Sequence, residues 1–207
     1  MEQPDMEHRR PIAARRLGIV HRLTAGLVRA RITADAISLA GMAAGVAAGI
    51  AFAFAPKFWP LWLLAALLVQ LRLMANLLDG MVAVASGTAS TMGELYNEVP
   101  DRVSDTAVLA GLGWAAGSLA LGLAAALAAM ATAYVRTLGR GLAQTSDFRG
   151  PMAKQQRMAV ATAVGVWCAV APATWAAPVP GLALWVITLL AGFTALRRLA
   201  GVAKALR

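Results

Sequence analysis

Half of the acidic residues in this chain stand in one short window. The 207 residues include ten Asp and Glu, and five of these lie between positions 79 and 105. The five are Asp79, Glu94, Glu98, Asp101 and Asp105. Spaced carboxylates and carboxamides on helices suit a hard divalent cation that also takes phosphate ligands. The window therefore indicates a site for Mg²⁺, Mn²⁺ or Ca²⁺ together with a phosphate-bearing substrate.

Two helix faces would carry this site. The first has residues at i, i+3 and i+7, which are Asn76, Asp79 and Ala83. Gly80 removes a side chain beside Asp79, where a backbone or a phosphate could approach closely. The second face repeats every four residues and comprises Gly93, Asn97, Asp101 and Asp105. Pro100 either kinks this second helix or marks its start.

The elements that hold these faces are predicted to be membrane spans. The chain is 59% hydrophobic and 14% charged, whereas roughly a quarter of the residues of a soluble domain are charged. Crossing roughly 30 Å of hydrocarbon takes about 20 apolar residues. Six segments are long enough: 34–54, 59–84, 94–117, 118–141, 156–176 and 180–200. We therefore expect an all-α, integral membrane bundle of six transmembrane helices, and the lone Cys168 reads as one of its core residues.

The basic residues predict how the bundle is oriented. The net charge is +9, but the bases flank the spans and form no single patch, which argues against nucleic-acid binding. They gather before the first span, between spans four and five, and after the last, whereas the opposite loops hold only Lys57. Cytoplasmic loops carry the excess of Lys and Arg. Both termini are therefore expected in the cytoplasm, in a multi-pass protein of the inner (cytoplasmic) membrane.

The first 33 residues form a basic region ahead of the spans. We divide the chain into this region, 1–33, and the membrane domain, 34–207. Within 11–31, apolar residues can share one broad helix face while Arg15, Arg22 and Arg29 lie seven apart on another. This pattern favours an amphipathic helix at the lipid surface, and a disordered tail up to about Arg16 is the alternative.

The window resembles the CDP-alcohol phosphotransferase family, whose signature is D-x2-D-G-x2-A-R-x8-G-x3-D-x3-D. Its eight positions are occupied in register by Asn76, Asp79, Gly80, Ala83, Val84, Gly93, Asn97 and Asp101. The segment 32–38, which contains Asp35, resembles the T-P-N-x-I-[ST] stretch that opens the first span of the family. Three motif positions depart from the signature: Asn76 and Asn97 replace Asp, and Val84 replaces Arg.

The resemblance implies a function and a set of site residues. A phosphatidyl or related phospho-alcohol group would pass from a CDP-alcohol, usually CDP-diacylglycerol, to a small hydroxyl acceptor, and CMP would leave. The metal ligands implied are Asp79, Asp101, Asn76 and Asn97, which would hold one or two Mg²⁺ or Mn²⁺ ions, and Asp101 would be the general base. The CDP contacts implied are Asp79, Gly80, Ala83, Gly93 and Asp35. A homodimer is implied as well.

The three departures predict a weaker metal site than the family has. Asn carbonyls ligate hard cations, but two negative charges are missing, so two close divalent ions would be less well neutralised. We expect a single ion, or compensation by Glu94, Glu98 or Asp105. The phosphate of an acceptor has its candidate partners in Lys154, Arg157 and Arg140.

Other readings of the same residues stay open. Asp79 and Asp101 could form buried ion pairs with Arg72 or Arg102, and Asp105 could pair with Arg102 or with another helix. The asparagines and glycines could serve helix packing, and Glu94 and Glu98 could be solvated. At the level of the protein, the alternatives are a family member that binds a nucleotide-lipid without turnover, and a six-helix transporter.

Overall fold

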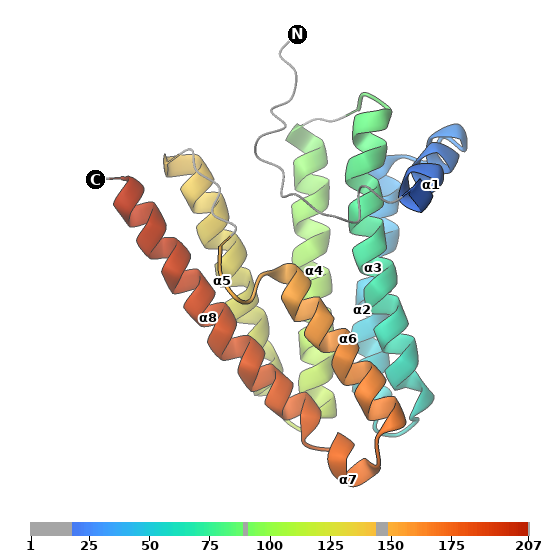
Figure 1. Cartoon of the computed structure of the whole chain (residues 1–207), viewed down its shortest axis with the longest axis vertical. Helices are drawn as coiled ribbons and strands as arrows, with labels where there is room; N and C mark the ends of the chain where they lie inside the picture. Colours follow the sequence, from blue (N-terminus) through green and yellow to red (C-terminus); the bar gives the residue numbers. More distant parts are fainter. Residues whose placement is uncertain (1–17, 89–90, 144–148, 207) are drawn as a thin grey trace.

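The described part of the chain folds into helices alone. The computed structural model describes residues 18–88, 91–143 and 149–206. Its helices are α1 (Gly18–Arg29), α2 (Ala34–Phe54), α3 (Pro60–Ala85), α4 (Thr91–Ala115), α5 (Leu119–Ala143), α6 (Lys154–Val170), α7 (Ala173–Ala176) and α8 (Val179–Ala205). The long helices run along one bundle, and α1 lies across its end, beside the top of α3 (Figure 1).

Five of the predicted spans each correspond to one long helix, whereas the predicted span 156–176 is divided between α6 and the short α7. The helices also differ in how well they suit a membrane. Within the described ranges, four helical segments are long and apolar enough to cross a bilayer: Ala34–Phe54, Pro60–Ala85, Leu119–Ala143 and Ala173–Ala205. Helix α4 carries the charged residues of the acidic window, and α6 has 17 residues, which is short of the roughly 20 that a span needs. The molecule is thus a bundle with several membrane-compatible helices.

The predicted breaks between helices are confirmed. Helix α4 ends at Ala115 and α5 begins at Leu119, and Gly117 lies between them with φ of +71°, a conformation that glycine adopts without steric cost. Pro100 lies inside α4, so this helix begins before the proline, at Thr91. The helix therefore carries Asp101 and Asp105 in its middle portion.

Helices α2 and α4 pack with their backbones almost in contact. A Cβ atom placed on Gly111 would lie 2.0 Å from the carbonyl oxygen of Gly49, and one on Gly45 would lie 2.5 Å from the Cβ of Ser104. Only glycine permits such a close approach. The contact fixes α2 against the helix that carries Asp101.

Helix α1 docks on the end of the bundle. Val20 is buried in a small apolar cluster with Ile37, Leu77, Leu78 and Val82. Ile19 and Leu23, by contrast, have exposed side chains. The apolar residues predicted to share one face are therefore divided, with Val20 against α2 and α3 and the other two turned outward. The first 17 residues, with the rest of the predicted amphipathic segment, lie outside the described residues.

The connection into α6 enters the bundle instead of crossing its end. In Figure 1 α6 begins about half-way along the bundle. The backbone N–H of Met152 donates to Thr194 Oγ1 at 3.2 Å, and Arg198 Nε donates to the carbonyl of Arg149 at 2.9 Å. Gly150, with φ of +131°, lies against Thr194. Helix α8 thereby holds the start of α6 beside the acidic residues of α4.

Candidate active site

Asp79 is a buried carboxylate on α3 whose two oxygens are both hydrogen-bonded. Ser38 Oγ, on α2, donates to Asp79 Oδ2 at 2.6 Å, and the backbone N–H of Gly80 donates to Oδ1 at the same distance. Asp79 is 3% exposed. Each oxygen still has a second lone pair, so the carboxylate is oriented by α2 and remains able to bind a cation.

Two neighbours of Asp79 leave room for a ligand. Asn76, one turn earlier on α3, has its Oδ1 atom buried without a hydrogen-bond partner. A Cβ atom placed on Gly80 would meet nothing within 4 Å, so this glycine borders open space and does not serve close helix packing. A buried acceptor without a partner calls for an explanation, and a bound cation at Asn76 and Asp79 would supply one.

Asp101 is buried on α4 among three basic side chains. Arg72 Nη2 from α3 and Lys154 Nζ from the first residue of α6 both pair with its Oδ1 atom. Arg102 Nη2 lies 3.7 Å from its Oδ2 atom. Arg72 also donates from Nε to Ser104 Oγ at 3.1 Å. Asp101 thus joins α3, α4 and α6 at one point.

A second ion pair lies one turn deeper on α4. Asp105 Oδ2 accepts from Arg157 Nη2 at 2.9 Å, and both side chains are buried. Arg157 Nη1 also donates to the carbonyl of Met152 at 3.0 Å. On α5, the carbonyl of Thr132 accepts from Arg198 Nη1 at 2.9 Å. The pair therefore fixes the start of α6 against α4.

The remaining predicted residues lie around this core. Ala83 is half-buried on α3, Gly93 lies in the first turn of α4, and Asp35 is exposed in the first turn of α2. Arg140 is exposed in the last turn of α5. The side chains of Asn97 and Glu94 lie outside the described residues.

The structure decides among the alternative readings of the acids. Asp101 forms the ion pairs foreseen with Arg72 and Arg102, and Asp105 pairs with α6. Asp79 accepts from Ser38 and Gly80. Glu98 pairs with Arg136 and with Arg102, and its side chain is 46% exposed, so it lies at the exposed edge of the cluster.

Sequence reasoning overlooked the partners that come from distant helices. Ser38 stood in the segment compared with the family, but only Asp35 was singled out there. Arg198 was counted solely as a topology signal, although it is 4% exposed. Its position within an apolar helix was the available sign, since ionisable residues inside membrane helices face the bundle interior.

The described residues fit one divalent ion better than two. Among the residues that the structure describes, no group of three or more His, Cys, Asp or Glu is placed to hold a metal. Asn76 and Asp79 offer buried oxygens, and Gly80 beside them borders open space. Asp101, the other charged ligand, is already surrounded by Arg72, Lys154 and Arg102. A dication placed there would be repelled by these cations.

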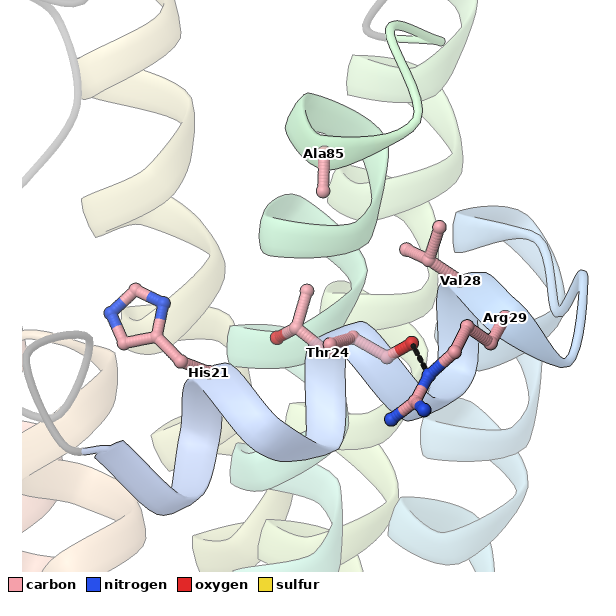
Figure 2. A pocket seen from close by; sticks show the side chains of 6 residues that line it. His21, Thr24, Val28, Arg29 and Ala85 are labelled. Atoms are coloured by element: carbon pink, nitrogen blue, oxygen red, sulfur yellow. Dashed lines mark hydrogen bonds between the residues drawn. The ribbon is translucent and has the colours of Figure 1, made fainter.

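A hollow of about 430 Å³ lies away from these acids, between α1 and the end of α3. Its lining is His21, Thr24, Ala25, Val28, Arg29 and Ala85. Figure 2 shows the side chains of α1 facing the last turn of α3, with Arg29 Nε bonded to its own helix at the carbonyl of Ala25. No carboxylate lines it, so it is separate from the candidate active site.

Solved structures share this arrangement of helices. The phosphatidylinositol phosphate synthase of Mycobacterium tuberculosis (PgsA1), a CDP-alcohol phosphotransferase, matches with a TM-score of 0.77 in its structure with CDP-DAG bound. The match covers 90% of this chain and 94% of that one at 20% identity. This chain has the CDP-alcohol phosphotransferase fold.

Two other structures of the same synthase agree. The complex with manganese and citrate gives a TM-score of 0.76 at 20% identity and covers 89% of this chain and 88% of that one. The apo form gives 0.71 at 22% identity and covers 88% and 95%. No protein-family model matches the chain. No curated protein matches it either.

Proposed function

We propose that the protein transfers a phosphatidyl or related phospho-alcohol group from a CDP-alcohol to a small hydroxyl acceptor, with release of CMP, in phospholipid biosynthesis. The observation that carries this proposal is the site itself. In a fold shared with a synthase solved with CDP-DAG, motif residues Asn76 and Asp79 offer buried oxygens beside Gly80, which borders open space. Arg72 and Lys154, which pair with Asp101, also lie close enough to interact with the charge of Asp79. CDP-diacylglycerol is therefore the proposed donor.

The chemistry is a displacement at phosphorus. The acceptor oxygen forms a bond to the β-phosphorus of the donor, the bond from that phosphorus to CMP breaks, and the hydroxyl proton passes to Asp101. The Oδ2 atom of Asp101 is the less crowded oxygen, since Arg72 and Lys154 both pair with Oδ1. A base must reach the proton directly or through one water.

A divalent ion would assist this step. The neighbour was solved with manganese, and Asn76 with Asp79 would hold Mg²⁺ or Mn²⁺ here, with Asn97 as a further ligand. The bound ion would neutralise the diphosphate and stabilise the leaving CMP. Ser38 orients Asp79 for this role through its 2.6 Å hydrogen bond.

Lys154 is the strongest of the three candidates for holding an acceptor phosphate. It opens α6, where backbone N–H groups and the helix dipole favour an anion, and its Nζ atom has no hydrogen-bond partner beyond the ion pair with Asp101. Arg157 is engaged by Asp105. Arg140 lies at the exposed end of α5.

The membrane setting and assembly belong to the same proposal. The protein would lie in the inner membrane with both termini in the cytoplasm, residues 1–33 forming the basic interfacial region and 34–207 the catalytic domain. A homodimer is proposed from the resemblance alone. The alternative is a relative that binds a nucleotide-lipid without turnover, which the neutral Asn76 favours.

One assay separates transfer from binding alone. Purified protein in lipid nanodiscs would receive radiolabelled CDP-diacylglycerol, Mn²⁺ and a panel of small alcohols and sugar phosphates. The proposal expects CMP release that is lost in Asp101→Asn and kept in Lys57→Gln, a charge change in the exposed turn between α2 and α3. Donor binding without CMP release for any acceptor would contradict the transferase proposal and favour a protein that binds a nucleotide-lipid without turnover.

A further inference from the structure

Asp101 differs from the other acidic residues because the basic side chains around it carry more positive charge than its carboxylate can neutralise. Arg72 and Lys154 pair with one oxygen, and Arg102 lies 3.7 Å from the other. One carboxylate is thus matched by three cations. Glu98 also accepts from Arg102 at 3.3 Å, and Asp105 and Asp79 attract Arg72 and Lys154 without pairing with them directly.

The positive charge at Asp101 is built into the core of the bundle. Arg72 is 2% exposed, and its Nε atom is fixed by Ser104. Gly41 on α2 leaves the room that this side chain needs, because a Cβ atom there would lie 3.1 Å from Arg72 Nη1. Lys154 is held by the anchored start of α6. Buried charges without full compensation are costly, so such a site favours an anionic ligand.

Two donor groups of the cluster can also take a further acceptor. Arg72 Nη1 is buried and forms no hydrogen bond, and the buried Lys154 Nζ has no partner besides the Asp101 carboxylate. Unsatisfied buried donors are uncommon in folded proteins. The oxygens of a diphosphate would supply both the missing charge and the missing acceptors.

The positions that lack an acidic ligand lie close to the basic side chains around Asp101. Position 76, where the family signature has Asp, is Asn, and position 97 is also Asn. Arg72 lies one turn before Asn76 on α3 and reaches Asp101, the last motif acid. The missing negative charge at positions 76 and 97 and the positive charge of Arg72 and Lys154 both act against a second divalent ion.

We propose that Arg72 and Lys154 provide, beside Asp101, the positive charge that a second divalent ion would otherwise bring, so that the diphosphate of a nucleotide-lipid binds here with a single ion. This inference rests on the proposed function, because it takes a CDP-lipid as the ligand, and it places Lys154 where the donor diphosphate and the acceptor phosphate would meet. Guanidinium and ammonium groups bind phosphate oxygens directly. In this chain the donor would therefore be held partly by fixed cations of the protein.

The decisive experiment counts ions in the unmodified protein. Full-length protein in nanodiscs would be saturated with CDP-diacylglycerol and titrated with Mn²⁺, with bound ion followed by electron paramagnetic resonance. The proposal expects one tightly bound Mn²⁺ per chain and an uncoupled spectrum. Two ions with a spin-coupled spectrum would overturn it while leaving the transferase proposal intact. No binding of CDP-diacylglycerol at any Mn²⁺ concentration would instead remove the proposed function.

Variants test whether Lys154 and Arg72 supply the positive charge that takes the place of a second ion. At saturating Mn²⁺, Lys154→Gln should weaken CDP-diacylglycerol binding at least tenfold, whereas Lys57→Gln should leave it unchanged. The triple variant R72M/N76D/N97D should bind a second Mn²⁺, with thermal unfolding confirming that it folds. Unchanged affinity for CDP-diacylglycerol in Lys154→Gln would contradict the role of Lys154 in binding the diphosphate.

Discussion

At the scale of single residues, hydrogen bonds from distant helices orient the acids of the candidate site. Asp79 depends on Ser38 of α2, and Asp105 on Arg157 of α6. Each acid is buried, so its partner both offsets the cost of burial and fixes its direction. The consequences of removing a partner are therefore large enough to measure.

Ser38→Ala should weaken both the fold and the site. The substitution leaves a buried carboxylate oxygen short of one donor, which typically costs about 1–3 kcal/mol of unfolding free energy. Equilibrium unfolding in mixed micelles would measure this loss, and Mn²⁺ affinity should fall in parallel. Thr188→Ala is the matched control, because its hydroxyl only donates to the carbonyl of Leu184 in its own helix. Equal effects of the two substitutions would contradict the role given to Ser38.

Asp105→Asn should be strongly destabilising. It leaves the Arg157 guanidinium buried without its anion, and breaking a buried pair in this way costs about 3–5 kcal/mol. The double variant D105L/R157M should regain most of that stability because no charge is left unpaired. Glu98→Gln, whose carboxylate is 46% exposed, should change the unfolding free energy by no more than about 1 kcal/mol. Unfolding in mixed micelles is again the measurement.

At the scale of elements, the start of α6 is the part of the structure that most directly builds the site. Lys154 and Arg157 reach the acids of α4 because α8 anchors the connection at Arg149 and Met152. The anchoring requires glycine at position 150, where φ is +131° and Thr194 fills the space beside the Cα atom. This element can therefore be tested without touching a charged group.

Gly150→Ala should loosen the connection and displace Lys154. A Cβ atom there would lie 2.3 Å from Thr194 Cγ2, and a side chain at this φ adds about 1–3 kcal/mol of strain. Hydrogen exchange of residues 149–157 should speed up, and donor binding should weaken. Gly192→Ala is the control, since a Cβ atom at that helical position meets nothing within 4 Å. Unchanged exchange in Gly150→Ala would show that the anchor lies elsewhere.

The helices were predictable from sequence, whereas the contacts between them were not. Runs of apolar residues broken by Gly and Pro located α2, α3, α5 and α8 to within a few residues, because span length is set by the bilayer. Motif spacing located Asp79 and Asp101. Spacing along one helix does not reveal which face of another helix meets it, so the convergence of Arg72 and Lys154 on Asp101 required three-dimensional structure. Hydropathy predicts the length of a span but not the depth at which a helix begins in the bundle, so the mid-bundle start of α6 could not be predicted.

At the scale of the whole molecule, most of the bases belong to α1 and to the helix ends on the same side of the bundle, where α1 lies beside the upper part of α3 in Figure 1. The cytoplasmic side of a membrane protein carries the excess of Lys and Arg. The turn between α3 and α4 should therefore face the cytoplasm, and the turn between α2 and α3 should face the opposite side.

Single cysteines would test this orientation. Cys168 is buried and is the only cysteine of the chain, so Cys168→Ala provides the background. In inverted membrane vesicles, whose cytoplasmic face is outside, a membrane-impermeant maleimide should label Ser86→Cys and spare Lys57→Cys. The opposite labelling pattern would reverse the predicted topology. Equal labelling of both sites after detergent addition confirms that each cysteine is reactive.

The mid-bundle start of α6 has a consequence for how two unlike reactants meet. The late start of α6 places Lys154 and Arg157 beside Asp101 and Asp105, away from the ends of the long helices. Under the proposed function, a water-soluble acceptor would have to reach that depth from one face of the membrane, while a lipid donor would arrive from the leaflet between the long helices. The reaction would then take place below the headgroup plane, and neither reactant would have to leave its own phase.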